Sequence, residues 1–138
     1  MQLLYTAMLR LDPAVSAAER CELVQQTLDL LGLTKCAHYS CDKASKQKLS
    51  GGQMRRVGIG AELVTRPSIL MLDEPTSALD VSVQAVILKL LMRLKKELGM
   101  SYLFVSHDLN VVRLLCDRVI VMYLGQIVEI GTRQEVFE

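Results

Sequence analysis

The chain has 138 residues, of which 51% are hydrophobic and 22% are charged, and its formal net charge is +1. This composition is typical of a single soluble α/β core and excludes a disordered chain. The charge balance gives no indication of nucleic-acid binding, and the longest apolar run, residues 119–124, is far below the roughly 20 residues of a membrane span.

Two amphipathic helices are predicted at the start of the chain. Apolar residues at helical spacing favour a helix over residues 3–11, which Pro13 ends. Ser16 and Glu19 form a capping-box pattern that predicts the start of the second helix, and Gly32 is its expected stop.

A polar connector without periodic apolar residues follows over residues 35–48, and it contains a candidate metal cluster. Cys36 and Cys41 flank His38 there. A structural zinc site needs a second pair of ligands, which this spacing lacks, so free thiols in a reducing cytoplasm are the favoured interpretation.

A third helix is predicted over residues 51–64, and Ser50 can cap its N-terminus. Gly51 and Gly52 carry no side chain that would keep a ligand from the unpaired N–H groups there, where the helix dipole favours an anion. The pattern predicts an anion site, although a Ser-Gly-Gly sequence taken alone is more often a turn.

The apolar residues 69–72 predict a strand that is buried on both faces, and Asp73 and Glu74 follow it directly. Open α/β sheets bind ligands at the carboxyl ends of their parallel strands. These carboxylates are therefore candidates for metal binding and base catalysis, although a single Asp-Glu-Pro sequence after a strand is usually a solvated loop.

The next helix is the clearest one in the sequence. Asp80 is its expected cap, its apolar stripe covers residues 83–98, and Gly99 ends it. A second strand is predicted over residues 102–105, and His107 follows it in a Ser-His-Asp sequence. A lone histidine at such a place is mostly structural.

The last part of the chain predicts a short helix over residues 111–116 and a hairpin formed by residues 119–123 and 126–130. Thr132 and Glu135 are the expected caps of a final helix.

Four of these segments, in this order and at suitable spacing, resemble motifs of the nucleotide-binding domain of ATP-binding-cassette (ABC) transporters. Residues 49–53 resemble the signature, residues 69–73 resemble Walker B, residues 77–80 resemble the D-loop, and His107 resembles the switch histidine. The resemblance covers essentially the whole chain. Each motif taken alone has an ordinary structural explanation, such as a turn, a solvated loop or a structural histidine. The occurrence of all four motifs together argues against these ordinary explanations.

The resemblance implies ATP and Mg²⁺ as cofactors and a role for each site residue. Asp73 is at the magnesium position, Glu74 is at the position that polarises the attacking water, and His107 contacts the γ-phosphate. In the family, the signature meets the γ-phosphate held by the opposite subunit of a head-to-tail dimer, and the D-loop couples the two sites. The implied cofactor-binding residues are Leu49, Ser50, Gly51, Gly52 and Gln53 of the signature and Asp80 of the D-loop.

The implied fold class is α/β, a fragment of a P-loop NTPase-like ABC cassette. Residues 1–48 correspond to the helical subdomain, and residues 49–138 to the C-terminal part of the RecA-like ATPase core. The phosphate-binding G-x-x-x-x-G-K-[ST] loop is not found, because the sequence has no Gly-Lys pair. We therefore expect the Walker A strand and loop to be absent and the isolated chain to be inactive as an ATPase.

Different parts of the chain resemble two different ABC subfamilies. Residues 4–11, 30–36 and 62–70 are similar to white-type half transporters, whereas the chain from Ser77 onward is similar to ATPase subunits of bacterial dipeptide, oligopeptide and nickel importers. This pattern suggests a mosaic with its junction near residues 73–77.

The function implied by the resemblance is ATP hydrolysis that drives solute transport, with small peptides as the best guess for the solute. The implied partners are a second nucleotide-binding domain and transmembrane permease subunits, which would hold the chain at the cytoplasmic side of a membrane; no nucleic acid is expected. One alternative is a non-catalytic partner that supplies the signature and D-loop in trans. Another is a soluble ABC ATPase of DNA repair or translation.

Overall fold

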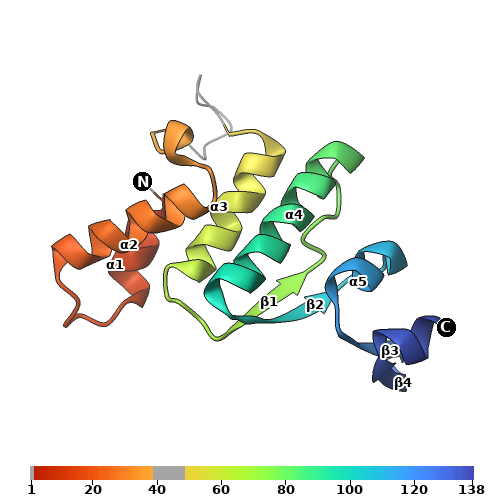
Figure 1. Ribbon diagram of the computed structural model, residues 1–138. Coiled ribbons are helices and arrows are strands. Elements are labelled where there is room, and N and C mark those ends of the chain that lie inside the picture. Colours follow the sequence, from red (N-terminus) through yellow and green to blue (C-terminus); the bar gives the residue numbers. More distant parts are fainter. Residues whose placement is uncertain (1, 39–48) are drawn as a thin grey trace. The chain divides into compact units, whose positions relative to one another are not determined.

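The computed structural model describes residues 2–38 and 49–138, which form two compact units. The first unit contains Thr76–Tyr102 together with the described residues up to Leu70, and the second contains Met71–Pro75 and Leu103–Glu138. Figure 1 shows the order of helices and strands. Their mixture confirms the predicted α/β class. The predicted division at residue 48 stays a prediction, and the end of the polar connector lies outside the described residues.

Three helices and one short turn begin the first unit: α1 (Gln2–Arg10), α2 (Ala17–Leu30), the 3₁₀ turn η1 (Thr34–Cys36) and α3 (Gly51–Leu63). The predicted capping box starts α2, because the Ser16 side chain accepts from the Glu19 amide and the Glu19 carboxylate accepts from the Ser16 amide. After this helix Gly32 has a φ of 62°, a left-handed conformation that glycine adopts without strain. The largest fully buried side chains of this unit are Leu31, Leu33, Val64, Ile87, Leu91 and Leu94.

Two glycines inside α3, Gly58 and Gly60, cost about 1 kcal/mol each relative to alanine, and the sequence predicts close helix packing as the reason for them. The prediction is confirmed at Gly60, where a Cβ would lie 2.5 Å from Leu31 Cδ1 and 3.2 Å from Leu3 Cδ2. It is wrong at Gly58, which is exposed and where a Cβ would have no neighbour within 4 Å.

Helix α4 (Val81–Leu98) has the predicted ends. Asp80 is its N-cap, and its carboxylate accepts from the Val83 amide at 2.9 Å. Gly99 ends it with a φ of 62°.

Strands β1 (Ile69–Asp73) and β2 (Ser101–Val105) form a two-stranded sheet, and both extend from the first unit into the second. The Ser101 amide donates to the Ser68 carbonyl near their starts, and the Glu74 amide donates to the Val105 carbonyl near their ends. The two strands therefore run parallel, and both carboxyl ends lie at one edge.

Only one face of β1 is buried, so the prediction of a strand buried on both faces is wrong. Leu70 and Leu72 are buried, whereas Ile69 and Met71 are 60% and 72% exposed. The apolar run of this sequence gives the strand two faces that favour burial, and the described residues cover one of them.

The second unit contains four further elements: α5 (Leu109–Leu115), β3 (Arg118–Tyr123), β4 (Gln126–Thr132) and α6 (Arg133–Phe137). Strands β3 and β4 form the predicted antiparallel hairpin, whose turn residues Leu124 and Gly125 have φ values of 48° and 77°. Thr132 and Glu135 form a reciprocal capping box at the start of α6, as predicted.

Within the described part of the chain, no helix combines the length and the apolar character needed to cross a membrane.

Candidate functional site

The parallel strands bring two predicted catalytic residues into contact within the second unit. Glu74 directly follows β1, and His107 lies two residues after β2. Nδ1 of His107 is 2.7 Å from Oε1 of Glu74, and the backbone N–H of His107 donates to the same oxygen at 3.0 Å. Because an ionised carboxylate only accepts hydrogen bonds, the imidazole is the donor in this pair. Two N–H groups of one residue thus orient the Glu74 carboxylate.

The electrostatics of the pair follow from this contact. The hydrogen bond to Glu74 raises the pKa of His107, and the negative charge of Glu74 raises it further. The histidine side chain is 80% exposed and the glutamate side chain 32% exposed. The pair is therefore open to solvent from the histidine side and can meet a ligand there.

The segment after β1 carries backbone strain at two places. Glu74 has a φ of 44° and Ala78 has a φ of 58°, both in the left-handed region. A non-glycine residue in this region costs about 1–2 kcal/mol. Such conformations persist where surrounding contacts hold them, which is common at functional sites.

Asp73, the predicted magnesium ligand, is the last residue of β1 and is exposed. Its carboxylate has no hydrogen bond or ion pair to any other described residue. Mg²⁺ is commonly held by one or two carboxylates together with substrate phosphates, so an exposed carboxylate here fits that ion. No cluster of three or more potential ligands for a metal is present among the described residues.

The predicted signature lies in the first unit, at the start of α3. Ser50 caps the helix: its Oγ accepts from the Gln53 amide at 3.3 Å, and Gln53 Oε1 accepts from the Ser50 amide at 2.8 Å. In the first turn of α3, the backbone N–H groups of Gly51 and Gly52 donate to no acceptor among the described residues. Leu49 precedes the cap and is half-buried. The helix start therefore has the donors and the dipole that an anion needs.

The two signature glycines have different surroundings, and the predicted role of Gly52 at an anion stays a prediction. Gly51 is exposed, and a Cβ there would make only an ordinary contact, 3.8 Å from Leu79. Gly52 is buried, and a Cβ there would lie 2.7 Å from Val83 Cγ1. The missing side chain at Gly52 is thus required by packing against α4.

Asp80, predicted as a cofactor-binding residue of the D-loop, acts in the structure as the cap of α4. The Ser82 hydroxyl and the Val83 amide both donate to its carboxylate, and these bonds lower the pKa of Asp80. Its contact with a nucleotide stays a prediction. Signature and D-loop belong to the first unit, whereas Asp73, Glu74 and His107 belong to the second.

Some contacts of the signature helix were not predicted. Gln53 donates from Nε2 to the Cys36 sulfur at 3.0 Å, and Arg55 donates to Ser77 of the D-loop. The Ser-x-x-Gln spacing is a capping-box pattern that could have predicted the bonds between Gln53 and Ser50, but it gives no signal for the bond to Cys36. The Arg55 contact joins residues distant in sequence and has no local signal. Cys36 is a free thiol, and Cys41 of the candidate metal cluster lies outside the described residues.

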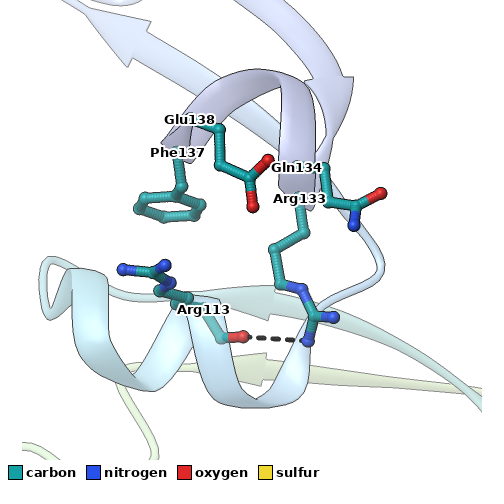
Figure 2. Close-up of a pocket in the computed structure, with 5 residues that line it drawn as sticks. All are labelled: Arg113, Arg133, Gln134, Phe137 and Glu138. Atoms are coloured by element: carbon teal, nitrogen blue, oxygen red, sulfur yellow. Dashed lines mark hydrogen bonds between the residues drawn. The ribbon is translucent and has the colours of Figure 1, made fainter.

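A pocket of about 200 Å³ lies between α5 and α6, and Figure 2 shows the side chains around it. Its lining residues are Arg113, Arg133, Gln134, Phe137 and Glu138. One of its arginines is engaged, because Arg133 Nη1 donates to the Arg113 carbonyl at 3.2 Å. No predicted site residue lines this pocket.

Comparison with known proteins gives consistent matches. The model of the family described as ABC transporter matches residues 4–77. The oligopeptide transport ATP-binding protein OppF of Streptococcus mutans is 45% identical over 122 residues, which cover 87% of this chain and 38% of that protein. The dipeptide transport ATP-binding protein DppF of Escherichia coli is 43% identical over 129 residues, which cover 94% of this chain and 37% of that protein.

A solved structure agrees with these relatives. CbiO1 from Clostridium perfringens, described as part of the ABC transporter complex cbiONQ, matches with a TM-score of 0.80 and 35% sequence identity. The match covers 96% of this chain and 51% of that one.

The extent of these alignments can be compared with the two subfamily resemblances found in the sequence. An alignment to DppF that covers 94% of the chain includes residues on both sides of the expected junction at 73–77. The similarity to peptide-transport ATPases is thus not confined to the part after Ser77. The white-type resemblance of the earlier part stays a prediction.

Proposed function

The chain belongs to the ABC transporter family, and on this premise we propose that it forms part of a nucleotide-binding domain whose ATP hydrolysis drives solute transport. It spans 38% and 37% of the two peptide-transport relatives, so the activity proposed is that of the whole domain. The observation that carries the proposal is the 2.7 Å contact between Glu74 and His107 at the carboxyl ends of two parallel strands. A carboxylate oriented in this way is suited to accept a proton from water.

Each site residue has a role in this proposal. Bound MgATP supplies the phosphoryl group and the metal charge that the loose transition state of phosphoryl transfer needs. Asp73 would hold the magnesium ion, and Glu74 would orient water and accept its proton. His107 keeps Nδ1 on Glu74, which leaves Nε2 for a phosphate oxygen.

The signature residues act on a different nucleotide. The first-turn amides of α3 and the Ser50 side chain bind the terminal phosphate of a nucleotide held by a second cassette, and Leu49 and Gln53 shape the start of that helix. Asp80 keeps the D-loop at the start of α4. A second nucleotide-binding domain is therefore a required partner.

The names of the relatives point to the solute. Oligopeptide and dipeptide transport ATP-binding proteins are the similar curated proteins, and we infer small peptides as the transported class. Transmembrane permease subunits are then the second kind of partner, and they hold the chain at the cytoplasmic side of the membrane.

A grafted cassette tests the proposal. The segment of E. coli DppF that aligns with this chain is replaced by all 138 residues, so that DppF supplies the remaining parts of the domain. We expect the purified graft to hydrolyse ATP and to restore dipeptide uptake in cells that lack DppF. A soluble graft that binds MgATP without hydrolysing it would contradict the proposal and favour the non-catalytic partner that supplies the signature and D-loop in trans.

A further inference from the structure

We propose that Arg55 is a positioning residue that fixes the D-loop, residues 77–80, to the signature helix α3, and that the two motifs therefore act as one rigid element. This inference rests on the proposed function for the roles of the two motifs, whereas the contacts that support it are independent of that function. All residues involved lie in the first unit.

The first contact is a pair of hydrogen bonds from one guanidinium group. Nη2 of Arg55 donates to the Ser77 hydroxyl at 3.2 Å and to the Ser77 carbonyl at 3.4 Å, and both bonds are partly buried. A planar guanidinium can serve two acceptors at once, whereas methionine, of similar length, can serve neither. Arg55 lies one turn into the signature helix, so these bonds connect the helix directly to the D-loop.

The second contact is the packing of the two helix starts. Gly52 lies against Val83, where a Cβ would approach to 2.7 Å. Val83 in turn donates its amide to Asp80, the last residue of the D-loop. The D-loop is thus attached at its beginning by Arg55 and at its end through α4.

The backbone between these attachments needs external support. Ala78, next to Ser77, has a φ of 58° and is exposed, so its own side chain does not hold this conformation by packing. The conformation is unfavourable for alanine, and the contacts on either side must maintain it. Loss of the Arg55 bonds is therefore expected to release residues 77–79.

Relaxation of ¹⁵N nuclei in the whole chain tests the attachment. In the parent protein we expect backbone order parameters of about 0.85 at residues 77–79, and in R55M values below about 0.6. S77A removes the hydroxyl acceptor of Arg55 and keeps the carbonyl acceptor, so its order parameters are expected to lie between those of the parent and R55M. The double variant should match R55M, since R55M already removes both bonds between Arg55 and Ser77. K89M, at an exposed lysine of α4, is the matched control and should equal the parent. Equal order parameters in R55M and K89M would overturn the inference.

The grafted cassette gives a second, functional measurement. We expect R55M to lower ATP turnover by at least about fivefold, because that is the effect of one typical hydrogen bond and R55M removes two. KM should not change, because the remaining parts of the domain still bind the nucleotide. R55K, which keeps one donor group, should recover part of the turnover. Unchanged turnover in R55M would overturn the inference. A graft that has no activity even with Arg55 contradicts the proposed function instead, and the order parameters then decide the inference alone.

Discussion

The substitution G52A separates the packing role of the second signature glycine from its role at a phosphate. The new Cβ would lie 2.7 Å from Val83 Cγ1, closer than non-bonded carbon atoms approach. Val83 is β-branched and has one strongly preferred rotamer in a helix, so it cannot turn away without cost. We therefore expect G52A to destabilise the nucleotide-free chain by about 1–3 kcal/mol, the usual cost of overpacking.

The neighbouring glycines provide matched controls on the same helix. An added Cβ meets an ordinary contact at Gly51 and open space at Gly58. G58A is expected to stabilise the chain by up to about 1 kcal/mol, because alanine is the better helix former. G51A is expected to leave stability nearly unchanged.

The assay is urea unfolding followed by circular dichroism, with V83A as the second arm of a double-mutant cycle. V83A alone leaves a cavity, but it removes the atom that the new methyl group meets. We expect G52A/V83A to be more stable than the sum of the single effects predicts, by about 0.5–3 kcal/mol. A stability of G52A equal to that of G51A would refute the packing argument and leave phosphate access as the reason for this glycine.

Three further predictions follow from the site and the hairpin. First, E74Q should move the midpoint of the His107 titration, read by NMR, towards lower pH, because Glu74 raises the pKa of His107. The contact stabilises the folded chain, and this stabilisation is fully present below about pH 6.5 and is lost as the pH rises through the raised pKa of His107. An unmoved midpoint would exclude an electrostatic effect of Glu74 on His107. Second, titration calorimetry should show weak or no MgATP binding to the 138-residue chain, which has no Gly-Lys pair; micromolar affinity would contradict this. Third, L124N should stabilise the chain by about 1 kcal/mol, because asparagine tolerates a positive φ better than leucine. Leu124 is 86% exposed, so little packing is lost, and an unchanged or lower melting temperature would refute this assignment of strain.

Local signals predicted the ends of the helices. Ser16 caps its helix through Glu19, and Asp80 accepts from an amide three residues later. Gly99 ends its helix with a left-handed backbone conformation. These signals are local, so the sequence alone shows them. The roles of Glu74 and His107 were predicted less directly, from the binding of ligands at the carboxyl ends of parallel strands and from the family resemblance. Their direct contact was not predicted.

Local patterns in the sequence could not predict the tertiary contacts. The close approach of Gly52 to Val83 and the bonds of Arg55 to Ser77 depend on how two helices pack, which no spacing in the sequence encodes. The exposure of Ile69 was missed for a related reason. An apolar run shows which faces of a strand favour burial, and it does not show which of them the described residues cover.

The central claim is that Glu74 activates water in an ABC-type ATPase, and E74Q in the grafted cassette tests it most directly. The amide keeps the shape of the carboxylate but cannot accept a proton. We predict that E74Q binds MgATP as tightly as the parent graft and loses most of its steady-state ATP turnover, and that H107A loses turnover through its missing phosphate contact. Turnover of E74Q within about twofold of the parent, less than the effect of one typical hydrogen bond, would contradict the account.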